Sequence, residues 1–278
     1  MFQILGILIA ARPAPRPTRC LGEDARLNTI PGPPFEEQHS EYVTLGMGND
    51  HFHIAYSARN GPNCEPDITG NNVLIAVFEL MDGRALIFGS GYGDRTHETL
   101  CFGARYGSDV DADLVDEILR GCLRLGDAKL VFAVPHGHVD HVNPEFVHAL
   151  ETRGHTFDEL WVHVGDESEV RDMPAEPEAW DADEQNRICA FGSLASSCET
   201  QASDPDTISF ATTVGTAFFS RREGHTPGAV DLVLQHVSGN YILLGSAPPG
   251  AAGATNCDNA LYNQAIQVWN PHGNLVYQ

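Results

Sequence analysis

The sequence is poor in basic residues. It contains 16 Lys and Arg against 38 Asp and Glu, and Lys129 is its only lysine. A formal net charge of −22 repels phosphate backbones and anionic membrane surfaces. We therefore expect no nucleic-acid partner, and we interpret the acidic surplus as a solvated shell.

No apolar run is long enough to cross a bilayer. The longest candidate, residues 1–11 (MFQILGILIAA), falls well short of the roughly 20 residues that a membrane helix needs. We therefore expect no stable membrane insertion. The run resembles the tail of a signal peptide, but it has no basic segment before it and no clear A-x-A site after it.

Cysteine pairs of the C-x-x-C type are absent, which argues against a zinc knuckle or a thioredoxin-like motif. Seven cysteines are nevertheless many for a reduced compartment. Cys189 and Cys198 bracket a short loop and could be bridged, whereas Cys122 lies in a helical pattern and is expected to be a buried apolar residue. The predicted location is extracytoplasmic or secreted, with the cytoplasm as the alternative.

Residues 1–40 are rich in Pro, Arg and Gly and are interpreted as an N-terminal extension, and residues 41–278 as one domain. Strands in two runs, each followed by helices, predict two mixed β-sheets packed face to face with helices outside, an α+β fold. Residues 167–186 are interpreted as irregular. The predicted strands are Tyr42–Leu45, His51–Ser57, Val73–Leu80, Arg84–Phe88, Leu130–Val134, Glu159–Val164, Thr216–Ser220, Ala229–His236 and Tyr241–Leu244, and the predicted helices are Asp111–Leu125, Pro144–Arg153 and Asp258–Trp269.

The densest group of chemically active residues follows the apolar run 130–134. His136, His138, Asp140 and His141 fall within six positions. Three imidazoles and a carboxylate are ligands suited to zinc. On an extended segment His136 and His138 project to the same side, and a turn could bring Asp140 and His141 to a neighbouring metal. Gly137 would let the backbone bend between them.

Two more histidine loops follow regular elements, the usual setting of a site residue. His225 lies in Gly-His-Thr-Pro-Gly after a strand, and His272 lies in Pro-His-Gly after a helix. His51 and His53 could line a cleft, although partly exposed polar positions are the favoured interpretation. The chain has neither a G-x-S-x-G elbow nor a P-loop, so a serine nucleophile and nucleotide hydrolysis are not indicated.

The strings H-G-H-V-D-H, G-H-T-P-G and a late P-H-G resemble those of the metallo-β-lactamase superfamily, from about Tyr42 to the C-terminus. The resemblance implies an αββα sandwich and two metal ions. Zinc is expected, and manganese or iron is not excluded. The first ion would be held by His136, His138 and His225. The second would be held by Asp140, His141 and His272.

Some family positions are altered. Ser246 stands where many members have a bridging Asp, so it is assigned to the second ligand shell, and Phe88 replaces the Asp of an early L-I-D-T-G string. The resemblance implies a hydrolase that uses a metal-bound hydroxide, oriented by Asp140 as the catalytic residue, to open a small ester, lactone or lactam. The alternatives are a metal-binding domain without turnover and a phosphodiesterase or nuclease of the superfamily. The partner is a small-molecule substrate, and the oligomeric state stays open.

Overall fold

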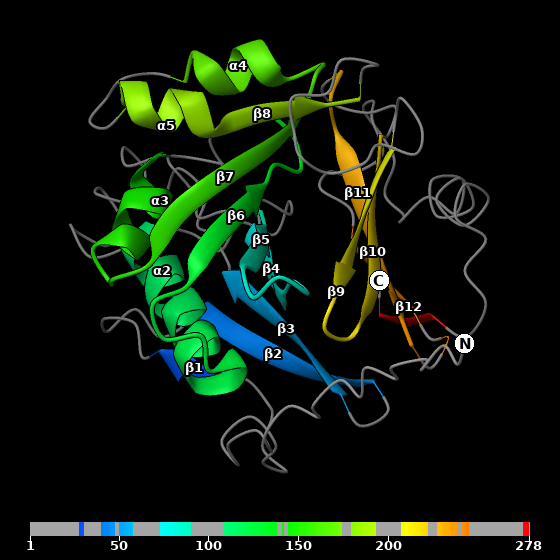
Figure 1. Ribbon diagram of the computed structural model, residues 1–278. Coiled ribbons are helices and arrows are strands. Elements are labelled where there is room, and N and C mark those ends of the chain that lie inside the picture. Colours follow the sequence, from blue (N-terminus) through cyan, green and yellow to red (C-terminus); the bar gives the residue numbers. More distant parts are fainter. Residues whose placement is uncertain are drawn as a thin grey trace, which may run out of the picture.

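The computed structural model describes residues 28–30, 40–47, 50–57, 73–89, 108–137, 141, 144–173, 179–192, 207–221, 227–237, 239, 241–244 and 275–277. They form two mixed β-sheets (Figure 1). The predicted helix 258–269 and the loop 60–70 lie outside these residues. β1 falls within the predicted extension, and the boundary at residue 40 stays a prediction.

The first sheet has eight strands in the order of the chain. Antiparallel pairing joins β1 to β5, and parallel pairing joins β5 to β8. The predicted strands at residues 73–80 and 84–88 are confirmed and form an antiparallel hairpin, with Gly83 at a positive φ in its turn. The strands are β1 (Asn28–Ile30), β2 (Ser40–Met47), β3 (Asp50–Ser57), β4 (Val73–Glu79), β5 (Ala85–Phe88), β6 (Lys129–Ala133), β7 (Thr156–His163) and β8 (Ile188–Phe191).

The second sheet has five strands in the order β13-β12-β11-β10-β9. Its pairs are antiparallel except that between β12 and β13, which is parallel. The predicted strands at residues 229–236 and 241–244 are confirmed as β11 and β12, which pair as neighbours. The strands are β9 (Thr207–Thr212), β10 (Gly215–Arg221), β11 (Val230–His236), β12 (Tyr241–Leu244) and β13 (Leu275–Tyr277).

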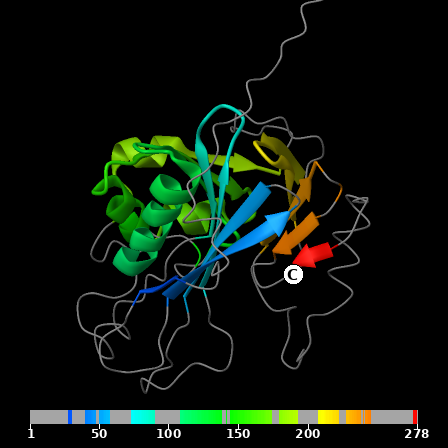
Figure 2. The same cartoon turned by 90° about the horizontal axis from the view of Figure 1, so that it is seen from below.

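Helices cover the outer face of the first sheet, and the second sheet lies on its inner face (Figures 1 and 2). The predicted helix 111–125 is present as an α-helix that continues into a π-helix, which ends where Arg124 takes a left-handed conformation. The helices are α2 (Ser108–Glu117), η2 (Ile118–Leu123), α3 (Pro144–Glu151), α4 (Glu167–Arg171) and α5 (Ala182–Arg187).

The central strands of the first sheet are buried on both faces. Alternate residues point to opposite sides of a strand, so β6 sends Leu130 and Phe132 to the helices and Val131 and Ala133 to the second sheet. The sheet-to-sheet core includes a stacked pair, Phe88 and Phe219, with ring centroids 5.3 Å apart. Burial on both faces explains why these strands are continuous apolar runs in the sequence.

The prediction of an irregular region at residues 167–186 is wrong. This region contains α4 and most of α5. α5 begins with a capping box, in which the Asp181 side chain accepts from the Glu184 backbone N–H and the Glu184 side chain accepts from the Asp181 backbone N–H. β8, β9 and β13 were also not predicted.

Two cysteines of the described residues, Cys122 and Cys189, are disulfide-bonded. Cys122 is buried as predicted, but as half of a disulfide rather than as a free apolar side chain. Within the described part of the chain, no helix combines the length and the apolar character that a membrane crossing requires.

Candidate metal centre

Three segments meet at one end of the sheets: the residues after β6, the turn after β7 and the residues before β11. The Val134 backbone N–H donates to the Trp161 carbonyl at 2.9 Å, and the Val230 N–H donates to the Pro135 carbonyl at 2.8 Å. The second of these bonds ties the residues just before His136 to the strand that follows the His225 loop. The two histidine motifs are therefore joined through the described backbone.

The structure brings together two of the predicted metal ligands. His136 is 2% exposed, and its ring centroid lies 3.7 Å from that of His141, which is partly exposed. Two imidazoles in contact, one of them buried at the end of a strand, fit the donor chemistry of a zinc site. The remaining predicted residues lie outside the described residues: His138, Asp140, His225, Ser246 and His272.

Asp166 links these segments from the turn after β7. Its carboxylate accepts a hydrogen bond from the Gly137 N–H at 2.8 Å and another from the Gly228 N–H at 2.7 Å. The residue is 1% exposed. Asp166 was not singled out from the sequence, because both partners are distant along the chain, 29 and 62 residues away. The only sequence signal is an Asp three residues after the end of β7, the strand that pairs with β6.

Neighbouring atoms lie too close to three glycines of this region to leave room for a side chain. A Cβ at position 137 would lie 3.0 Å from the Asp166 Cβ, and a Cβ at position 228 would lie 2.6 Å from the Asp166 Cγ. A Cβ at position 165 would lie 2.8 Å from the backbone carbon of Pro227. Gly137 is not at a positive φ. It therefore serves to admit a neighbouring side chain, as well as the bend predicted from the sequence.

The other described histidines are mostly buried. His53 is 1% exposed, so the prediction of a partly exposed position is wrong. His163 Nδ1 accepts from the Gly165 N–H at 3.0 Å, which shapes the turn that presents Asp166. Burial lowers the pKa of His155, and its hydrogen bond to Asp116 opposes that shift.

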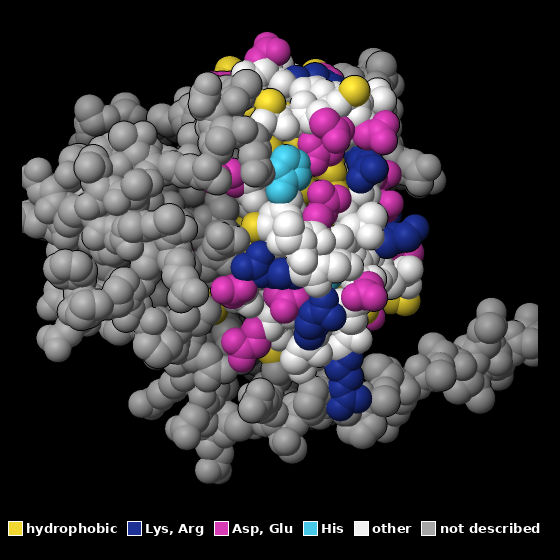
Figure 3. Space-filling model, turned by 90° about the vertical axis from the view of Figure 1, so that its left-hand side faces the viewer, with side chains coloured by type: hydrophobic (Ala, Val, Ile, Leu, Met, Phe, Trp, Pro, Cys, Tyr) yellow, Lys and Arg dark blue, Asp and Glu magenta, His cyan; other side chains and the backbone are white. Residues whose placement is uncertain are grey.

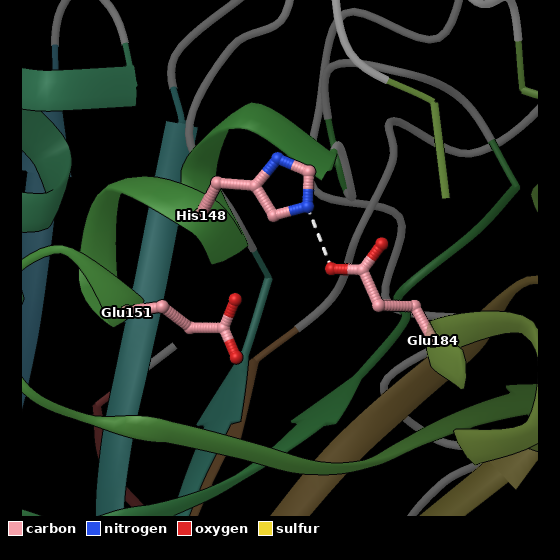
Figure 4. A group of neighbouring side chains, drawn as sticks. All are labelled: His148, Glu151 and Glu184. Atoms are coloured by element: carbon pink, nitrogen blue, oxygen red, sulfur yellow. Dashed lines mark hydrogen bonds and ion pairs between the residues drawn. The ribbon is translucent and has the colours of Figure 1, made fainter. Parts of the chain in front are cut away.

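A second group of ligand-type side chains lies between α3 and α5 (Figure 4). His148 and Glu151 come from α3 and Glu184 comes from α5, and one donor atom from each lies within 4.8 Å of the others. His148 Nε2 and Glu184 Oε1 are 2.6 Å apart, closer than the roughly 3.3 Å between two donors on a tetrahedral zinc. The two carboxylates also accept from the backbone N–H groups of Phe157 and Asp181. The group therefore acts as a hydrogen-bonded clamp between two helices.

Acidic and basic side chains are interspersed on the face of the molecule that carries the helices (Figure 3). Arg153 pairs with Asp113 at 2.6 Å and Arg120 with Asp116 at 2.7 Å. Such exposed pairs contribute little to stability. On this face the few basic residues are largely matched by neighbouring carboxylates.

Comparisons with known proteins give matches among solved structures. No family model and no curated protein matches the chain. One match is a metallo-β-lactamase HARLDQ-motif mutant from Cronobacter sakazakii, at 12% identity and a TM-score of 0.36, covering 72% of this chain and 66% of that one. A β-lactamase domain protein from Burkholderia ambifaria matches at 13% identity and a TM-score of 0.45, covering 85% and 70%. A flavoprotein from Thermotoga maritima matches at 10% identity and a TM-score of 0.43, covering 81% and 47%.

The chain spans 66% of the length of the Cronobacter protein and 47% of the length of the Thermotoga protein. The architecture is given by the chain itself. Two mixed sheets pack face to face, with helices on the outer face of the first. The fold is α+β, as the sequence predicts.

Proposed function

We propose that the chain is a metal-dependent hydrolase that binds two zinc ions and opens a small ester, lactone or lactam bond. The observation that supports the proposal best is the contact between His136 and His141, with ring centroids 3.7 Å apart. Pro135, next to His136, accepts a hydrogen bond from the Val230 N–H at the start of β11. Imidazoles gathered in this way at a strand end provide a metal site, whereas an isolated surface histidine does not.

The ligand assignment follows the motifs. His136, His138 and His225 would hold one ion, and Asp140, His141 and His272 the other. When bound, the ions would lower the pKa of a coordinated water towards neutrality and polarise the carbonyl of the substrate. Asp140 would orient the water and take up its proton. Ser246 would offer a hydroxyl group at the position where many proteins with these motifs have a bridging carboxylate.

An extracytoplasmic location is part of the proposal. Cys122 and Cys189 are disulfide-bonded, and disulfides persist in oxidising compartments. Quantification of free thiols in protein isolated without reductant tests this point: seven reactive thiols after denaturation would contradict it.

The first experiment measures metal content by elemental analysis of protein purified without added metal. The same protein is assayed on a chromogenic cephalosporin, an acyl-homoserine lactone and bis-p-nitrophenyl phosphate. About two zinc ions per chain with turnover of either of the first two compounds supports the proposal. Turnover of the phosphodiester alone would move the chain to the nuclease class, and metal without turnover would make it a binding domain.

A pair of histidine variants locates the site. His136→Ala removes a proposed ligand and is expected to lose most zinc binding and turnover. The control, His148→Gln, changes a histidine of the helix clamp and is expected to keep both. Circular dichroism establishes that both variants are folded. Equal metal content in His136→Ala and the wild type would refute the assignment.

A further inference from the structure

The side chain of Asp166 does not serve its own helix. Asp166 precedes α4 as its N-cap residue, a position where Asp usually accepts a hydrogen bond from the first helical turn. No such side-chain bond is present. The backbone holds the residue instead: its N–H donates to the His163 carbonyl, and its carbonyl accepts from the Val170 N–H. The carboxylate is thus fixed in place and directed elsewhere.

Both carboxylate oxygens are directed at segments that carry proposed metal ligands. Oδ2 accepts from the Gly137 N–H, next to His136, and Oδ1 accepts from the Gly228 N–H, three residues after His225. Hydrogen bonds to an ionised acceptor are about twice as strong as neutral ones, and this acceptor is buried. One side chain therefore fixes the separation of the two segments.

The surrounding backbone leaves little freedom for another arrangement. The turn at Gly165 packs directly against Pro227, and a Cβ at Gly228 would overlap Asp166. The Val230–Pro135 backbone hydrogen bond restrains the same two segments from the other side. Asp166 and this bond together form a closed set of contacts around the base of the site.

We infer that Asp166 is a positioning residue: it holds Gly137, next to His136, and Gly228, three residues after His225, in the relative arrangement that metal binding requires. The inference rests on the proposed function, because it gives the hydrogen-bonded carboxylate a role in zinc affinity. Partners behind the ligands of a metal site commonly contribute about 10–100-fold to metal affinity or activity.

The test compares Asp166→Asn with Asp172→Asn, the same change at an exposed residue at the end of the same short helix. The Asn side chain keeps the size of Asp but offers one acceptor oxygen in place of two. Zinc titration of metal-free protein is expected to give an affinity about 10–100-fold lower for Asp166→Asn and an unchanged affinity for Asp172→Asn. If Asp166→Asn does not fold, Asp166→Ser, with a smaller side chain that keeps one oxygen, replaces it.

A second readout needs no metal. Hydrogen exchange of the metal-free protein, followed by mass spectrometry, is expected to be faster in Asp166→Asn at both segments, around residues 135–137 and 227–229, and unchanged in Asp172→Asn. Faster exchange with wild-type zinc affinity would overturn the positioning role and leave a structural one. If the wild type itself takes up no zinc, the proposed function fails. Hydrogen exchange then decides separately whether Asp166 holds the two segments together. Faster exchange at both segments in Asp166→Asn supports this role, and unchanged exchange overturns it.

Discussion

Gly228→Ala is the most direct perturbation of the contact between Asp166 and the segment that precedes β11. The new Cβ would meet the Asp166 Cγ at 2.6 Å, its backbone N at 2.7 Å and its Oδ1 at 2.8 Å. These distances are too short for non-bonded atoms, and one of the three contacts is with backbone, so the neighbouring turn must move. The φ of Gly228 is not positive, so Ala is allowed by its backbone conformation and the clash alone is tested.

The size of the effect follows from two contributions. Overpacking in a closed region costs about 1–3 kcal/mol, and loss of the Gly228–Asp166 hydrogen bond costs about 1 kcal/mol more. The free energy of unfolding should therefore fall by about 2–4 kcal/mol. Urea denaturation followed by tryptophan fluorescence measures it, because Trp161 and Trp180 are both buried.

The control is Gly126→Ala, the same substitution in an exposed turn where a Cβ would meet nothing within 4 Å. Its free energy of unfolding should stay within about 0.5 kcal/mol of the wild type, as for most surface substitutions. Equal stabilities for Gly228→Ala and Gly126→Ala would refute the tight contact between Gly228 and Asp166.

Three further results are expected. His155 Nδ1 accepts from the Ala128 N–H, so the folded state favours the neutral ring. Because folding lowers the pKa of His155, the contribution of this residue to stability is complete above about pH 6.5 and is lost as the pH falls. His155→Gln should therefore flatten the dependence of the urea midpoint on pH between about 7.5 and 5.5. An unchanged slope would contradict this. Glu184→Gln should lower the free energy of unfolding by about 1–2 kcal/mol in the same urea assay and leave zinc content unchanged, because the carboxylate joins His148 to the start of α5; a loss of zinc would show that the clamp binds metal. Chelation of the metal should lower the melting temperature measured by calorimetry, because metal at 100-fold above its Kd stabilises the folded state by about 2.7 kcal/mol. The near-ultraviolet dichroism at 25 °C should persist after chelation. Loss of that signal would contradict a site that the protein builds without the metal.

The strands could be predicted where the core dictates their sequence. β5 and β6 contact the helices on one face and the second sheet on the other, so both are short apolar runs that stand out from their surroundings. β8 is only four residues long and follows an acidic helix, so its sequence gives no such signal. The strand is defined by its parallel pairing with β7. α5 carries a readable signal, the capping box of Asp181 and Glu184, which was obscured by the acidic composition around it.

The candidate site shows a similar division. His136 and His141 stand out in the sequence because a dense group of imidazoles and a carboxylate is chemically distinctive, and the structure places the two rings in contact. Asp166 is an ordinary residue type among 38 acidic ones, and its importance comes from two hydrogen bonds that only the fold creates. Local patterns identify the donors of a site, whereas long-range contacts determine which residues hold the donors in place.

The separation between β6, which precedes His136, and β11, which follows the His225 motif in the sequence, is set by the packing of the two sheets. His136 comes directly after β6, and the segment after His225 runs into β11, which lies in the other sheet. The packing of aromatic and aliphatic side chains between the sheets sets the distance between these strands, and the Val230–Pro135 and Asp166 hydrogen bonds transmit it to the loops. A substitution in the sheet-to-sheet core near β6 and β11 would therefore alter the site without touching a ligand. Stability and metal affinity should fall together in such variants, whereas a change confined to a ligand lowers metal affinity alone.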